Sequence, residues 1–163
     1  MEPIFTEEDE FLGKLAGQAG SFALHVLLAL GTWLGMMFVG YVLNPASASQ
    51  WVILALSLLL PAFTGFLVAR FWQSEMATVT WLLGTIWILL FCLWLLDLPT
   101  GPGMCDRCEA SERIVRTLFS FPLPSGLIDN NGPFYATWPA ASLIGYSIGA
   151  ALAGKNSSSE FEE

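Results

Sequence analysis

Two cysteines separated by two residues are the strongest chemical signal in this sequence. Cys105 and Cys108 can close a small disulfide ring, and a helix starting at Glu109 would favour the thiolate of the first. The pair allows thiol–disulfide exchange, or a structural disulfide in an oxidising compartment. A zinc site would need acidic ligands or a second subunit, because no other cysteine and no histidine lies nearby. We therefore predict no metal site, and we favour a structural or inert pair over a redox one.

The single histidine is the second candidate. His25 falls near the start of an apolar segment, and an ionisable residue inside a membrane span is a candidate for function. A neutral imidazole can be an axial ligand to the metal of haem or chlorophyll, which makes His25 the candidate cofactor-binding residue. One histidine supplies only one ligand, however. The favoured interpretation is a hydrogen bond from His25 to a neighbouring helix.

Other chemistry finds little support in the residues. No Asp, Glu, Lys or Arg lies well inside an apolar segment, so ion-coupled transport is disfavoured. The sequence contains no Ser/His/Asp set and no glycine-rich phosphate loop. The net charge of −8 disfavours nucleic-acid binding, which needs a basic surface. A passive pore or a small-molecule site lined by hydroxyl groups stays open, and its candidate lining residues are Thr64, Thr80, Thr85, Ser142 and Ser147.

Four apolar segments must position these side chains. They are residues 21–43, 51–71, 77–96 and 134–153, in a chain that is 55% apolar and only 12% charged. A helix of about twenty residues crosses the hydrocarbon core, where every backbone polar group must be paired within its own segment. The sequence therefore predicts an all-α integral membrane bundle of four transmembrane helices. We expect a long structured loop over residues 97–133, with an amphipathic helix at 109–121.

Small residues recur every four positions in the fourth segment. Ala141, Gly145, Gly149 and Ala153 would form one smooth face of a helix. Such a face lets another helix approach closely, so we predict tight helix–helix contact there. The sequence does not say whether the partner helix belongs to this chain or to another.

In outline, a four-helix membrane protein with a thiol pair resembles the families of quinone-linked disulfide-forming membrane proteins. The resemblance implies electron transfer from dithiols to a quinone, with Cys105 and Cys108 as the redox pair. Those families carry a second cysteine pair as a relay. This chain departs from that pattern, because its third cysteine, Cys92, stands alone inside the third apolar segment.

The ends of the chain are polar. Residues 1–20 are an acidic tail that either is solvated or forms a short interfacial helix, residues 21–153 are the membrane domain, and residues 154–163 are a polar C-terminal tail with the composition of an appended sequence. Basic residues lie closer to the span ends on the side of the two termini. We therefore expect both termini in the cytoplasm and the loop 97–133 outside.

These observations favour a non-enzymatic membrane subunit over an enzyme. We expect it to assemble with itself or with a larger membrane complex through the face of Ala141, Gly145, Gly149 and Ala153. One alternative is a membrane thiol–disulfide oxidoreductase using Cys105 and Cys108, and the other is a passive channel or small-molecule-binding protein. The predicted environment is the lipid bilayer. The sequence requires no cofactor, and haem, chlorophyll and quinone stay open.

Overall fold

The computed structural model describes residues 7–43, 50–72, 74–97, 109–119 and 132–159, and nearly all of them are helical. The predicted all-α fold is confirmed. The elements in chain order are α1 (Glu7–Leu43), α2 (Gln50–Phe71), a short 3-10 helix η1 (Glu75–Val79), α3 (Trp81–Asp97), α4 (Ala110–Phe119) and α5 (Gly132–Ser159).

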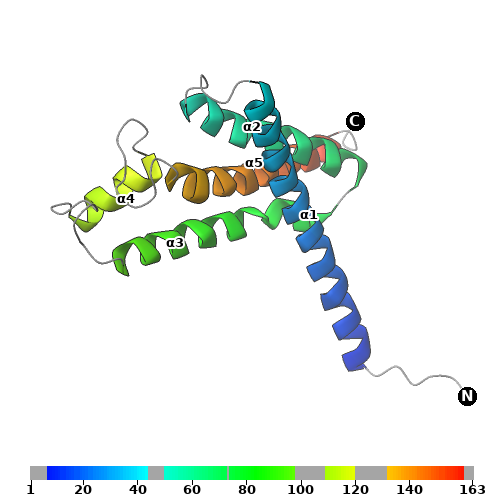
Figure 1. The fold of residues 1–163 in the computed structure, drawn as a ribbon. Helices are drawn as coiled ribbons and strands as arrows, with labels where there is room; N and C mark the ends of the chain where they lie inside the picture. The colour runs from blue at the N-terminus through cyan, green and yellow to red at the C-terminus, as the bar shows by residue number, and fades with distance from the viewer. Residues whose placement is uncertain (1–6, 44–49, 73, 98–108, 120–131, 160–163) are drawn as a thin grey trace, which may run out of the picture.

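The last helix, α5, is the centre of the fold. It lies between α2 and α3 and packs against both along its length (Figure 1). The first helix, α1, crosses this layer and contacts α2, α5 and η1, while its N-terminal part projects away from the other helices (Figure 1). At the opposite end, α4 lies against α5 and α3. Every other element therefore contacts α5.

Three helical segments are long and apolar enough to cross a membrane: Phe11–Val39, Trp51–Phe71 and Glu75–Asp97. Their outward surfaces carry large apolar side chains, such as Phe38 at 70%, Phe63 at 61% and Leu93 at 62% exposure. Exposing so wide an apolar surface to water is unfavourable, whereas lipid tails solvate it. The second and third segments match the predicted spans 51–71 and 77–96 closely, and the first overlaps the predicted span 21–43 but begins ten residues earlier.

The fourth predicted span differs from the other three. Only three of the described segments combine the length and the apolarity of a membrane span, and α5 is not among them. Its inner positions are small or polar, as with Ala140, Ser142, Tyr146 and Ala150, all of which are buried. Since α5 is surrounded by protein, it needs fewer large apolar side chains than a lipid-facing helix does. The tight helix–helix contact predicted for this segment therefore accounts for its lower apolarity, and its role as a fourth span stays a prediction.

Two local predictions concern the ends of the spans. The boundary expected between residues 20 and 21 falls inside α1, which runs without a break from Glu7 to Leu43. The amphipathic helix expected at 109–121 is present as α4. Leu118 of α4 is buried, and its carbonyl accepts a hydrogen bond of 2.8 Å from the Thr137 hydroxyl of α5. Residues 98–108 and 120–131 of the predicted loop 97–133 lie outside the described residues.

Candidate functional site

Glycines bring α2 and α5 into backbone contact. A Cβ atom added to Gly145 would overlap the carbonyl group of Leu58, and one added to Gly149 would overlap that of Ala62. From the other side, a Cβ atom added to Gly65 would overlap the carbonyl of Tyr146. No residue with a side chain fits at these positions without moving a backbone. The face predicted for helix contact is therefore covered at its two glycines by α2 of the same chain.

The alanines that complete this face are enclosed to different degrees. Ala153 is buried, whereas Ala141 is half-buried. Next to them, Gly84 allows α3 to approach α5, because an added Cβ would lie only 3.1 Å from the carbonyl oxygen of Ala140. Small residues thus hold both neighbours close to α5.

Hydroxyl groups join the helices where the small residues bring them together. Ser142 of α5 donates a hydrogen bond of 2.7 Å to the carbonyl of Ala29 in α1. Thr80, just before α3, donates one of 3.1 Å to the carbonyl of Leu143, and Ser147 donates one of 2.5 Å to that of Thr78. Two further hydroxyls, of Thr64 and Thr85, donate to carbonyls of their own helices. Of the residues considered as a pore lining, Thr80, Ser142 and Ser147 therefore join helices in this structure.

The buried histidine contacts two other elements. His25 is fully buried on α1, and its Nδ1 lies 2.8 Å from the hydroxyl oxygen of Tyr146, which is also fully buried, on α5. The imidazole also lies beside the ring of Trp72, with ring centroids 5.9 Å apart. The predicted hydrogen bond from His25 to a neighbouring helix is confirmed. We call Ser21, His25, Trp72, Ser74 and Tyr146 the polar cluster.

One atom of the polar cluster has no partner. The Nε2 atom of His25 is buried without a hydrogen bond to any described residue. The metal of a haem or chlorophyll would have to reach this atom, but the imidazole is fully buried, and the rings of Trp72 and Tyr146 lie 5.9 and 5.8 Å from it between centroids. A planar cofactor would need the packing around the imidazole to open. A ligand role for His25 stays a prediction.

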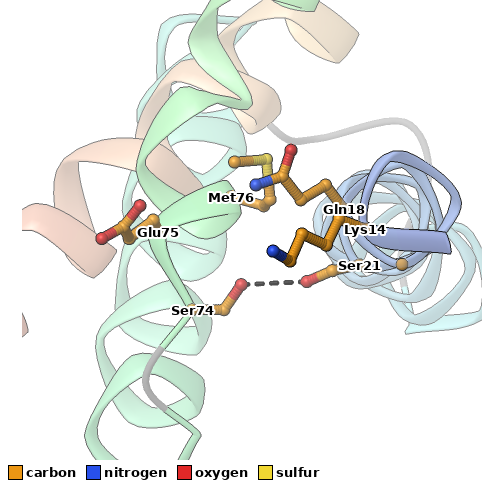
Figure 2. Close-up of a pocket in the computed structure, with 7 residues that line it drawn as sticks. Lys14, Gln18, Ser21, Ser74, Glu75 and Met76 are labelled. Atoms are coloured by element: carbon orange, nitrogen blue, oxygen red, sulfur yellow. Dashed lines mark hydrogen bonds between the residues drawn. The ribbon is translucent and has the colours of Figure 1, made fainter. Parts of the chain in front are cut away.

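The outer end of the polar cluster opens into a shallow pocket. The hydroxyls of Ser21 on α1 and Ser74 before η1 are 2.9 Å apart and hydrogen-bonded. They line a pocket of about 360 Å³ between α1 and η1, shown in Figure 2. Its other lining residues are Lys14, Gly17, Gln18, Glu75 and Met76. Ser74 occupies the N-cap position of η1 without capping it, so its hydroxyl is used across the pocket instead.

The predictions for the cysteines and for a metal site do not involve the polar cluster. Cys105 and Cys108 lie outside the described residues, and so does the disulfide expected between them. Cys92, on α3, is half-buried and unpaired. Among the described residues no group of three His, Cys, Asp or Glu side chains is placed to hold a metal ion.

Long apolar helices, lipid-facing side chains and an interior joined by small residues and hydroxyls define a multi-pass helical membrane protein. Comparison with models of known protein families, with curated proteins and with solved structures gives no match to this chain. Two contacts of the polar cluster could not be predicted from the sequence. Tyr146 lies 121 residues from His25, and Ser74 lies 53 residues from Ser21, so no local pattern connects either pair.

Proposed function

We propose that this chain is a non-enzymatic subunit of a membrane assembly, built from helices that pack both within the chain and against another chain. The observation that carries the proposal is the role of the polar side chains between the helices. Apart from the His25–Tyr146 pair, the interhelical side-chain bonds described above are hydroxyl bonds that hold helices together. An interior of this kind favours a structural subunit over an enzyme.

The surface for assembly must differ from the one that the sequence suggested, because α2 covers Gly145 and Gly149. A similar face is open on α1. A Cβ atom added to Gly31 or Gly35 would meet no other atom within 4 Å, and both glycines are exposed. Leu27 and Phe38 flank them with 66% and 70% exposure. Two glycines four residues apart, with large apolar neighbours, suit close packing against a second membrane helix.

Assembly is tested by molecular mass in lipid. The full chain is placed in phosphatidylcholine nanodiscs, and the number of copies per particle and any co-purifying protein are measured. We expect Gly31→Leu to reduce the particle to a single copy, or to release its partner, without lowering the unfolding free energy of the chain itself. Ala55→Leu is the matched control, since Ala55 is an exposed small residue on α2. A wild-type chain that is already a lone monomer would overturn the proposal.

Orientation is part of the same proposal. At about 1.5 Å per residue, the 28 residues of α5 extend about 42 Å, which exceeds a hydrocarbon core of about 30 Å. A protein-covered α5 can then act as the fourth span. Both termini would face the cytoplasm, with residues 97–133 outside. Labelling of single cysteines at both ends of the chain by a membrane-impermeant maleimide tests this, and opposite labelling of the two ends would contradict it.

A further inference from the structure

We propose that the pocket between α1 and η1 binds a phosphate group, such as that of a phospholipid headgroup. The proposal does not depend on subunit assembly. It follows from where the pocket lies, which groups line it and how these groups are already arranged.

The pocket lies where two spans end. One span ends at Phe71 and the next begins at Glu75, so the chain leaves the hydrocarbon core close to Ser74. The hydrogen bond between Ser74 and Ser21 places Ser21 of α1 at the same depth in the membrane. Arg70 in the last turn of α2 and the half-exposed ring of Trp72 are typical of a membrane interface. The pocket is therefore at the depth of the lipid headgroups.

The lining suits an anion. Lys14, Gln18 and Ser21 follow each other at intervals of four and three residues, so they share one side of α1. Figure 2 shows the ammonium group of Lys14 directed toward the Ser21–Ser74 hydrogen bond, while the carboxylate of Glu75 points away from it. The polar lining thus consists of one cation, two hydroxyls and an amide, together with the carboxylate that points away. The cation, the hydroxyls and the amide can all donate hydrogen bonds to phosphate oxygens.

The two serines are positioned to accept such a ligand. Their hydroxyls bond to each other, and a phosphate oxygen entering between them would accept a hydrogen bond from each. Hydrogen bonds to an ionised acceptor are about twice as strong as neutral ones, so this exchange is favourable. The pocket volume of about 360 Å³ is at the lower end of the usual range for small ligands, roughly 300–1,000 Å³. That size suits a headgroup phosphate better than a whole lipid, whose acyl chains can extend along the apolar surface of α1.

The core holds the pocket floor in place. Ser21 is one helical turn from His25, and Trp72, two residues before Ser74, contacts the His25 ring. The His25–Tyr146 hydrogen bond anchors both to α5. The spacing between the two serines is thus fixed from inside the protein, as a preformed site requires.

Native mass spectrometry of the full chain in a neutral, phosphate-free detergent tests the proposal. Short-chain phosphatidic acid is added in one arm, inorganic phosphate in a second and diacylglycerol in a third. We expect phosphatidic acid to bind, Lys14→Gln to weaken its binding about tenfold and Ser74→Ala about threefold. Arg70→Gln is the matched control, because Arg70 is an exposed cation at the same membrane level that does not line the pocket. We expect it to leave binding unchanged.

The arms separate the two sources of phosphate. Binding of inorganic phosphate that needs Lys14, without binding of phosphatidic acid, would support the anion site and assign it a soluble ligand. Equal binding of diacylglycerol and phosphatidic acid would overturn the proposal, as would equal losses in Lys14→Gln and Arg70→Gln. Unfolding of each variant in the same detergent is followed by circular dichroism. If Lys14→Gln loses its affinity only because it unfolds, the double variant Ser21→Ala, Ser74→Ala decides. Unchanged binding of phosphatidic acid by that double variant in its folded state would also overturn the proposal.

Discussion

The glycines of α5 and those of α1 have the same spacing but opposite surroundings. Gly145 and Gly149 face the backbone of α2, where even a methyl group would overlap a carbonyl. Gly31 and Gly35 have the same separation of four residues, and nothing lies within 4 Å of an added Cβ. A pair of glycines in a membrane helix therefore marks a surface that permits close packing. Whether the packing is intramolecular depends on which other helix the fold places there.

The largest effect is expected on α5. Gly149→Ala should lower the unfolding free energy by about 3 kcal/mol, the upper part of the range for overpacked sites, because the obstacle is a carbonyl of Ala62 rather than a flexible side chain. The measurement is a titration of the detergent-solubilised chain with sodium dodecyl sulfate, followed by circular dichroism. Gly35→Ala is the matched control and should raise stability by up to about 1 kcal/mol, since alanine favours helix more than glycine does. Equal losses in both variants would remove the distinction between the two faces.

The hydrogen bond between α1 and α5 comes next. Tyr146→Phe leaves the ring in place but removes the hydroxyl that contacts Nδ1 of His25, so both imidazole nitrogens would be buried without a partner. We expect a loss of about 2 kcal/mol in the same titration. Thr85→Val is the control, because that hydroxyl donates only within its own helix, and it should change stability by less than about 0.5 kcal/mol. A Tyr146→Phe variant as stable as the wild type would show that the buried pair contributes nothing.

The smallest effect concerns a single hydroxyl. Ser142→Ala removes the hydrogen bond to the Ala29 carbonyl, and interhelical bonds of this kind contribute about 0.6 kcal/mol on average in membrane proteins. Ser57→Ala is the comparison, since the Ser57 hydroxyl is also buried but donates to the Ile53 carbonyl of its own helix. We expect Ser57→Ala to be closer to neutral. A larger loss from Ser57→Ala than from Ser142→Ala would contradict the role of hydroxyl groups in joining α1 to α5.

The elements of the fold were predictable because their causes are local. A run of apolar residues has to form a helix in lipid, whatever it packs against, and the amphipathic pattern of α4 needed only its own ten residues. The hydrogen bond predicted for His25 followed from the tendency of polar side chains in membrane helices to bond to a neighbouring helix. The identity of that partner, Tyr146, did not follow, because any of several hydroxyls on a neighbouring helix would have met the same need.

The sequence by itself determined that this chain forms long apolar helices, that Gly145 and Gly149 permit close contact and that His25 needs a polar neighbour. The tertiary structure alone decided that α2 fills that contact, that α5 lies at the centre and that Ser21 meets Ser74 at the rim of a pocket. The physical reason is the range of the interactions. Helix formation depends on residues within a few turns, whereas the contacts between helices depend on residues that lie 53 or 121 positions apart and meet only once the helices have packed.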